Sequence, residues 1–368
     1  MAIPQVRRDD ERLNLVTSIP FFLVHLACLV AVFTGVYARD LALCGALYFG
    51  RMFFITAGYH RYFAHRSYRT NRVVQFLLAV GGTTAAQKGP LWWAGNHREH
   101  HRFADTEADV HSPLRGFWWS HAGWILCDRY GSVDYEEKIA DFARYPELRM
   151  VDKYNVFGPW LLAIGCYLWG GWSALVVGFF WSTVLLWHGT FTVNSLAHVV
   201  GRRRYATADT SRNSLLIALY TGGEGWHNNH HFRPSSARQG FYWWEIDTTY
   251  YILRTMSFAG LVRDLRRPAD HQRRSSRVKD GAFDFGMFRA YWTKAGGAIA
   301  GARADAGERL GATAASAGEA IEHGRQALGN TVDVTRQALE GGMRSTLESA
   351  EELARAARRS RRRPATTD

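Results

Sequence analysis

The sequence His97-Arg98-Glu99-His100-His101 decides the fold, because its spacing brings three imidazoles together. On an α-helix each residue advances by about 100°, so positions i, i+3 and i+4 project from one face. Each ring also carries polar nitrogens that need partners, which makes such a cluster unfavourable for packing alone. The pattern recurs at His227-Asn228-Asn229-His230-His231, and a sparser pair stands at His60 and His65.

These three clusters predict metal ligands. A lone histidine is usually a surface residue or a satisfied core residue, but two H-x-x-H-H matches and a third pair are hard to obtain by chance. Neutral imidazole suits Zn, Cu, Fe and Ni, whereas Mg and Ca prefer oxygen. Eight histidines exceed the four ligands of one tetrahedral site, so two metals are the economical number. The four cysteines contain no C-x-x-C and indicate neither a zinc–thiolate nor an iron–sulfur site.

The average composition conceals two unlike halves. Mean hydropathy is −0.22 and net charge is +12, as in a soluble basic protein. Nearly all aromatic residues and long apolar runs nevertheless lie before about residue 263. Four of these runs are candidate transmembrane helices, since about 20 apolar residues cross a hydrocarbon core. The predicted spans are residues 15–37, 41–59, 156–171 and 173–195.

The distribution of arginine predicts the orientation of these spans. Residues 1–14 are too polar for a secretory signal peptide, so we expect a cytoplasmic N-terminus. Arginines also follow the second and fourth spans, on the side where all three histidine clusters lie. We therefore predict an all-α, multi-pass integral membrane protein with four transmembrane helices. A cytoplasmic helical cap holds the metal site, and both termini are cytoplasmic.

Residues 267–368 form a different, polar segment that is rich in alanine, glycine and arginine. Its thinly spaced apolar residues indicate either a flexible, partly helical tail or a weakly amphipathic helix at the membrane surface. Six arginines among residues 355–363 suit anionic lipid or an acidic partner. We expect no nucleic-acid binding, because no reading module accompanies the charge.

The motifs resemble those of a known enzyme family. His60-Arg61-Tyr62-Phe63-Ala64-His65 and the two H-x-x-H-H segments resemble the three histidine boxes of membrane acyl-CoA desaturases of the stearoyl (Δ9) type, in a bacterial form. Asn194-Ser195-Leu196-Ala197-His198 and the segment at residues 116–124 resemble that family as well. The resemblance covers residues 15–266, which are the predicted desaturase domain, and the box spacing differs from that of alkane hydroxylases.

The resemblance implies a di-iron centre held by nine histidines and no carboxylate. It adds His198, which spacing alone does not single out. It also implies that Asn194, one helical turn earlier, reaches a metal through a water molecule. The nine implied ligands are His60, His65, His97, His100, His101, His198, His227, His230 and His231.

The resemblance further implies that the reduced centre activates O₂ and forms a cis double bond in a saturated acyl chain, with Δ9 of an acyl-CoA as the expected position and substrate. An unreactive C–H bond needs a cofactor, and the protein places the chain beside it. Gln87, Trp93 and Thr190 match the hydrogen-bonded trio that shapes the kink of the family's substrate tunnel. Lys88, Asn96 and Arg129 are the head-group candidates, in segments that depart from the animal pattern.

Several alternatives stay open at this point. The substrate could be carried by an acyl-carrier protein or a phospholipid, and a membrane hydroxylase is the nearest rival. A metal transporter is the rival from another class, but transport favours ionisable residues along the spans, which are nearly free of them. The sequence has no fused haem domain, so electrons must come from a separate ferredoxin, flavin reductase or cytochrome b5-type protein. A basic face suits an acidic donor.

Overall fold

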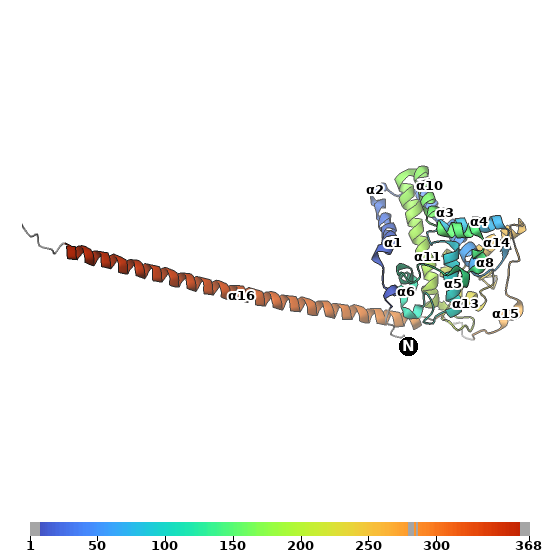
Figure 1. Ribbon diagram of the computed structural model, residues 1–368. Helices are drawn as coiled ribbons and strands as arrows, with labels where there is room; N and C mark the ends of the chain where they lie inside the picture. Colours follow the sequence, from blue (N-terminus) through green and yellow to red (C-terminus); the bar gives the residue numbers. More distant parts are fainter. Residues whose placement is uncertain (1–7, 279–282, 285, 361–368) are drawn as a thin grey trace, which may run out of the picture. The chain divides into compact units, whose positions relative to one another are not determined.

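The computed structural model describes residues 8–278, 283–284 and 286–360, and the described chain is mostly helical (Figure 1). Parts of the predicted N-terminal segment (residues 1–7) and tail (279–282, 285 and 361–368) lie outside these residues. The longer α-helices are α1 (Leu15–Ala27), α3 (Ala38–Phe53), α4 (Arg72–Thr83), α5 (Pro90–Phe103), α9 (Pro146–Lys153), α10 (Phe157–Ser173), α11 (Ser182–Asn194), α14 (Thr248–Phe258) and α16 (Gly286–Ser360).

Short elements connect these helices. The short α-helices are α2 (Ala31–Thr34), α6 (Phe117–His121), α7 (Tyr135–Lys138), α8 (Ala140–Ala143), α12 (Leu215–Tyr220), α13 (His227–Phe232) and α15 (Asp270–Arg274). The 3₁₀ and π segments are η1 (Asp9–Glu11), η2 (Cys28–Val30), η3 (Phe54–Ala64), η4 (Pro113–Arg115), η5 (Gly123–Leu126), η6 (Ala174–Trp181) and η7 (Leu196–His198). Two antiparallel strand pairs join β1 (Arg69–Thr70) to β3 (Val262–Arg263) and β2 (Gly201–Arg202) to β4 (Phe283–Asp284).

Among the described residues, three continuous helical stretches are long and apolar enough to cross a membrane. They are Leu15–Thr34, Ala38–Ala64 and Phe157–His198. The first begins at Asn14, whose side-chain oxygen accepts hydrogen bonds from the amides of Val16 and Thr17. The same side chain donates to Asp128 at 2.8 Å, which ties the start of this helix to the polar part of the protein.

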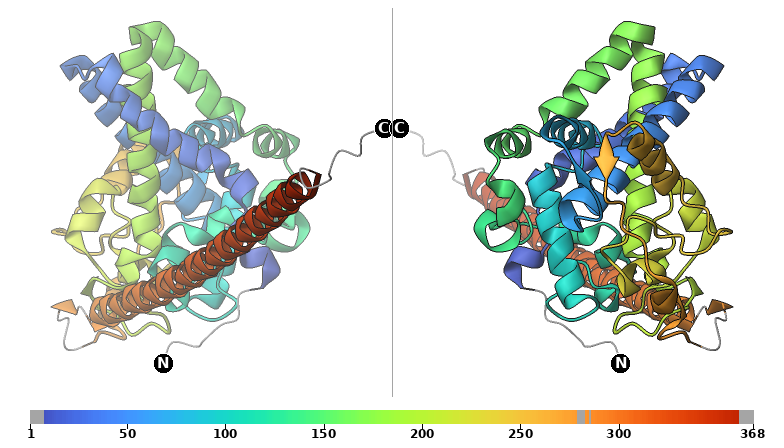
Figure 2. Two further views of the ribbon diagram at one scale, coloured as in Figure 1. Left: turned by 90° about the vertical axis from the view of Figure 1, so that its left-hand side faces the viewer. Right: turned by 90° about the vertical axis from the view of Figure 1, so that its right-hand side faces the viewer.

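The third stretch reverses direction at Gly170 and Gly171 and forms a hairpin of two helical arms (Figure 2). Gly171 has φ +68° and ψ −153°, a conformation that favours glycine because a Cβ would clash with the backbone. The two arms are α10 and the η6–α11 segment. Four membrane crossings, and the side to which the cap faces, stay predictions.

The helix that starts at Ala38 ends in a π-helix, η3, with 11 residues. In this wider helix the amide of residue i+5 reaches the carbonyl of residue i. The amide of His65 accordingly donates to the carbonyl of His60 at 3.1 Å. An ordinary α-helix would turn these two rings to different faces, whereas here their centroids lie 4.7 Å apart.

Arg61 anchors η3 in the core. Its guanidinium is fully buried and donates to Asp247 at 2.9 Å, to Glu224 at 3.0 Å and to the carbonyl of Ala237 at 2.8 Å. A buried charge needs such partners. The network fixes the segment that follows α12 against η3, and this segment contains the third histidine box.

Arg51 lies within the second apolar stretch and points into the helix bundle. It is buried and donates to Ser182 at 2.5 Å, to Thr183 at 2.8 Å and to the carbonyl of Thr84 at 3.2 Å. Its guanidinium also lies over the ring of Phe179. The arginine therefore joins three helical segments through hydrogen bonds without a carboxylate partner among these contacts.

The chain divides into two compact units, residues 1–292 and residues 293–368. The first unit contains the apolar helices and all three histidine boxes. The second consists of most of α16, in which each side chain that the structure describes is exposed.

Candidate metal centre

Five of the predicted histidines form a first group, in which one nitrogen of each ring lies within 4.8 Å of the others. η3 and its C-cap supply His60 and His65, α5 supplies His97 and His101, and α13 supplies His230. The Nε2 atoms of His65 and His97 are 2.9 Å apart, and those of His60 and His230 are 3.1 Å apart. His101 and His230 have a corresponding distance of 2.9 Å. His60 and His65 both reach this group because the π-helix η3 turns their rings to the same side.

The other four predicted histidines form a second group of the same kind. Its members are His100 from α5, His198 from η7, and His227 and His231 from α13. The Nε2 atom of His227 lies 3.0 Å from those of both His198 and His231. The structure thus brings together all nine residues, and α5 and α13 each contribute to both groups.

Carboxylates contact the outer nitrogen of several of these rings. The Nδ1 atom of His100 donates to Asp109 at 2.9 Å, and that of His231 donates to Asp209 at 3.0 Å. Glu224 lies 2.6 Å from Nδ1 of His60. Because a carboxylate only accepts, it holds the proton of the ring on Nδ1 and leaves a lone pair on Nε2. The inward-facing nitrogens of these rings are therefore bases.

This arrangement fits a metal ion better than it fits hydrogen bonding. His100 and His231 both keep their protons on Nδ1, yet their Nε2 atoms face each other at 3.4 Å. Two lone pairs at this distance repel unless a cation lies between them. Nitrogens that share one metal at about 2.1 Å lie about 3.0 to 3.4 Å apart, which agrees with the distances in both groups. Imidazole donors suit Zn, Cu, Fe and Ni.

The electrostatics favour neutral rings at several of these positions and charged carboxylates around them, whereas at His198 the carboxylate of Asp105 outweighs burial and raises the pKa. Burial, reinforced by neighbouring imidazoles, lowers the pKa of His97, His101, His227 and His230 well below the ordinary value. Burial of Asp109 acts to raise its pKa, but His100 and His111 outweigh burial and lower it to about 2. Neutral imidazoles backed by charged carboxylates are the forms that bind metals.

A cavity of about 480 Å³ adjoins the first group. Apolar side chains from α1, η3, α10, η6 and α11 line most of it, including Phe21, Ile55, Trp160 and Phe179. His60 and His97 belong to its wall as well. Such a lining suits an alkyl chain that passes beside the histidines.

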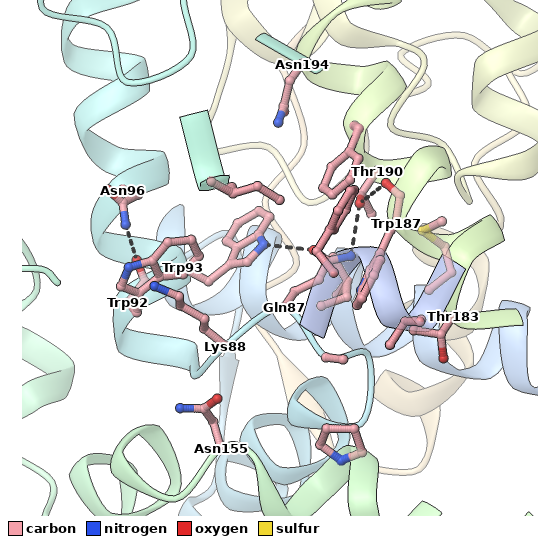
Figure 3. A pocket seen from close by; sticks show the side chains of 18 of the residues that line it. Gln87, Lys88, Trp92, Trp93, Asn96, Asn155, Thr183, Trp187, Thr190 and Asn194 are labelled. Atoms are coloured by element: carbon pink, nitrogen blue, oxygen red, sulfur yellow. Dashed lines mark hydrogen bonds between the residues drawn. The ribbon is translucent and has the colours of Figure 1, made fainter. Parts of the chain in front are cut away.

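A polar trio interrupts this apolar wall, as Figure 3 shows. The indole nitrogen of Trp93 donates to the side-chain oxygen Oε1 of Gln87 at 3.2 Å. The amide nitrogen of Gln87 in turn donates to the hydroxyl of Thr190 at 2.9 Å. The structure therefore joins α5, the loop before it and α11 through the three residues that the sequence singled out.

Comparison with known proteins places this geometry in a family. The sequence model of the fatty acid desaturase family matches residues 40–263. The chain belongs to the fatty acid desaturase family. The acyl-CoA 5-desaturase AL21 of Anemone leveillei is 37% identical over 262 residues, which cover 69% of this chain and 80% of that protein. The sn-1 stearoyl-lipid 9-desaturase of Anabaena variabilis is 39% identical over 212 residues, or 58% of this chain and 78% of that protein.

A third relative has a similar extent. The delta-9 desaturase-like 5 protein of Arabidopsis thaliana is 37% identical over 278 residues, which cover 73% of this chain and 91% of that protein. The membership identifies the chain as an oxidoreductase that desaturates fatty acyl chains in a membrane context.

The remaining predicted site residues of the desaturase occupy different environments. Asn194 lines the cavity, and its amide points into it (Figure 3). Asn96 also lines the cavity, but its amide donates to the carbonyl of Trp92 at 3.0 Å. Lys88 donates to the carbonyl of Gly131 at 2.8 Å and lies over the ring of Trp92. Arg129 contacts the carboxylates of Asp10 and Glu11.

Other histidines of the desaturase form a separate hydrogen-bonded string. Nε2 of His25 lies 3.1 Å from Nε2 of His188, and Nδ1 of His188 lies 2.9 Å from Nε2 of His121. His121 then contacts the hydroxyl of Ser195 at 2.9 Å. His111 stacks on His100 and lies 4.0 Å from Asp109. The contacts among His25, His188 and His121 link α1, α11 and α6.

The carboxylates around the imidazoles are functional residues that sequence reasoning missed. Asp105 and Asp109 follow the second box by four and eight residues, and Asp105 lies 3.3 Å from His198. Asp209 and Glu224 lie between His198 and the third box, which begins at His227. Metal-binding histidines usually donate their second N–H to a carboxylate. Acidic residues close to the histidine boxes in the sequence could therefore have been singled out as candidates.

Proposed function

We propose that this chain is an O₂-dependent acyl-CoA desaturase that introduces a cis double bond at Δ9 of a saturated chain. The proposed cofactor is a pair of Fe²⁺ ions, held by the nine histidines of the two groups and by Asn194 through a water molecule. The observation that carries the proposal is the position of His60 and His97, two members of the first histidine group, in the wall of an apolar cavity.

The reaction requires a redox-active ion, which excludes zinc, and the resemblance to the family implies iron. Desaturation removes two hydrogens with their electrons from an alkyl chain, so the metal must change oxidation state. Zinc cannot, whereas iron can and is accommodated by imidazole. The ions, when bound, supply O₂ activation and hydrogen abstraction. The carboxylates Asp109, Asp209 and Glu224 hold the ligand rings in one tautomer, which orients their lone pairs.

The cavity supplies the placement that an unreactive C–H bond requires. We propose that the acyl chain runs along the apolar wall and bends where Trp93, Gln87 and Thr190 interrupt it. The polar atoms of the trio hydrogen-bond to one another. They therefore need no hydrogen-bond partner on the alkyl chain. The bend would then hold one C–C bond beside His60 and His97.

For the carrier of the acyl chain there is a second candidate, a phospholipid. Relatives are named acyl-CoA desaturases and also lipid 9-desaturases. Lys88 supports acyl-CoA, since it offers a cation at the cavity. Arg129 favours a phospholipid-linked chain instead, because Asp10 and Glu11 already neutralise it. An acyl-carrier protein would be a third carrier.

The desaturase needs two electrons from a separate protein. We propose a ferredoxin, flavin reductase or cytochrome b5-type donor that docks on the cap, which we place on the cytoplasmic side of a four-span membrane domain. Exposed arginines such as Arg263, Arg266 and Arg267 offer positive charge to an acidic donor. Replacing these three arginines by glutamate should slow electron transfer and weaken its salt dependence. Unchanged donor kinetics would argue against this docking face.

Lipid analysis of a desaturase-deficient host tests the activity. The intact chain should restore cis monounsaturated acyl chains, and His100→Ala should not. His271→Ala is a matched control, because His271 is an exposed histidine on α15 outside both groups. Identical lipid profiles for the intact chain and His100→Ala would remove the assignment.

Purified enzyme then separates the finer alternatives. It is given stearoyl-CoA, stearoyl-acyl-carrier protein or stearoyl-phosphatidylcholine with reduced ferredoxin, and the products are located by mass spectrometry. Product from stearoyl-CoA alone supports the first proposal, and product from the phospholipid alone supports the second. A hydroxylated product would identify a hydroxylase, and a preparation active without iron would exclude the proposed cofactor.

A further inference from the structure

α16 has no partner for its surface within the second unit. Its side chains are exposed wherever the structure describes them from residue 296 to residue 355. Ten glycines, from Gly296 to Gly342, lie in this range with open space around them. Glycine is among the least favourable residues in a helix, and long helices in proteins are stabilised mainly by packing of one face. A helix of this composition therefore needs a surface to lie on.

Residues 299–353 contain five consecutive units of 11 residues. Eleven residues make three turns at about 98° per residue, so equivalent positions form a straight stripe along the helix. The first position of the units is always apolar, and the fourth and eighth positions are uncharged throughout. The larger side chains of this stripe are Ile299, Leu310, Ile321, Leu328, Val332, Leu339 and Met343, which are between 59% and 72% exposed.

The charges are sorted around this stripe. The fifth and eleventh positions lie about 65° to either side of its centre. Arg303, Arg325 and Arg336 occupy the fifth position, and Arg309 occupies the eleventh. All nine acidic residues of this range lie at least about 98° from the centre of the stripe, and Arg344 is the one arginine among them on that side of the helix. The apolar stripe is thus bordered by positive charge, with negative charge on the sides and back.

We propose that this face of α16 lies flat on the anionic lipid surface of the membrane in which the desaturase resides. Apolar residues bordered by arginine suit the headgroup region, where the stripe enters the acyl boundary and the guanidinium groups meet lipid phosphates. A straight stripe also matches a flat surface over the length of five units. The anchored apolar helices keep the tail close to that surface.

Pairing with a second copy is the rival occupant of this stripe. An 11-residue repeat can also form a right-handed coiled coil. In such a coil the flanking positions of the two copies meet, and ion pairs between them set the pairing. Here both flanks are basic or neutral, so two copies would place arginines together with no acidic partner at these positions. The charge distribution therefore favours lipid.

Labelled full-length protein in liposomes tests the proposal. Leu328→Cys places an environment-sensitive fluorophore on the stripe, and Glu319→Cys places it on the back of the helix. The chain without an added cysteine gives the background from its four native cysteines. Liposomes contain either phosphatidylcholine alone or phosphatidylcholine with about a third phosphatidylglycerol.

We expect the label at residue 328 to shift to the blue and to be quenched by brominated lipid in the anionic liposomes, and the label at 319 to remain in water. Replacing Arg303, Arg325 and Arg336 by glutamine should lower the ratio of bound to released tail by about a hundredfold, at about fivefold per arginine. Replacing three acids on the back, Glu308, Glu319 and Glu352, by glutamine is the matched control and should not release it.

Two results would overturn the proposal. Equal exposure of both labels to water in the anionic liposomes would show that the stripe does not meet lipid. Shielding of residue 328 that depends on protein density, together with cross-links between Leu328→Cys copies, would assign the stripe to self-association. Desaturase activity is measured in parallel, and we expect it to be unchanged in these variants because α16 contributes no residue to the histidine groups.

Discussion

Replacing Asp209 by asparagine should weaken the binding of one metal ion to the desaturase and leave the binding of the other unchanged. Oδ2 of Asp209 accepts the Nδ1 proton of His231 at 3.0 Å, and Oδ1 accepts from the amide of Ser211 at 2.9 Å. Asparagine keeps the shape and can keep the second bond. The change therefore removes the charge that orients His231 and little else.

The magnitude follows from the hydrogen bond that changes. A bond to a charged partner contributes about 1.5–3 kcal/mol, and a neutral one contributes about 0.5–1.5 kcal/mol. The difference of about 1–1.5 kcal/mol corresponds to roughly tenfold weaker binding of the ion in the second group. Loss of such a carboxylate typically weakens metal binding by about 10- to 100-fold, so tenfold is the expected lower bound.

The assay is metal content per protein after equilibration of the purified enzyme with a graded series of chelator. Asp209→Asn should pass through a state with one ion at a chelator concentration that leaves the parent protein with two. Glu224→Gln is the corresponding variant for the first group, because Glu224 contacts His60. It should weaken binding of the ion in that group instead. Asp264→Asn is the control, an exposed carboxylate whose ion pair is with Arg69. Identical chelator curves for parent and Asp209→Asn would refute the reasoning.

Three further predictions concern the cavity, the pH and the bundle. Thr190→Val removes the hydroxyl that accepts a hydrogen bond from the side-chain amide of Gln87. We therefore expect a two- to tenfold slower reaction, and a mixture of double-bond positions in the products by mass spectrometry. The control Thr192→Val, on the same helix, should change neither the rate nor the double-bond position. Because burial lowers the pKa of His97, His101, His227 and His230, the unfolded chain binds more protons as pH falls through about 6.5. The Tm of the metal-free protein should therefore decrease as the pH falls from about 7 to 5.5, and a flat profile over this range would contradict this. Arg51→Leu removes hydrogen bonds to Ser182 and Thr183 and should destabilise the detergent-solubilised protein by about 1–3 kcal/mol, whereas an unchanged melting curve would show that those bonds contribute nothing.

The second and third boxes could be predicted as shared sites because helix geometry is local. The i, i+3 and i+4 spacing of His97, His100 and His101 determines their common face once the segment is helical. The first box could not be predicted in this way. His60 and His65 are five residues apart, and only a π-helix, which tertiary packing imposes, turns both rings to one side.

The carboxylate partners depend on contacts that no local period encodes. Glu224 reaches His60 across 164 positions of the chain, and it does so because buried Arg61 fixes the segment around it. His198 was found by resemblance, since a single histidine after an apolar run has no spacing to mark it. Sequence patterns thus predict which rings bind, and the folded chain decides what holds them.

The division of imidazoles along α5 and α13 has a consequence for metal choice. His97 and His101 face one group while His100 faces the other, and α13 is split in the same manner. With two ions bound as proposed, the distance between them would be set by the helix geometry of α5 and α13 rather than by flexible loops. An ion of a different radius would require different metal–nitrogen distances in its own group. Because α5 and α13 supply ligands to both groups, a shift of either helix to meet that requirement would also displace the ligands of the other group.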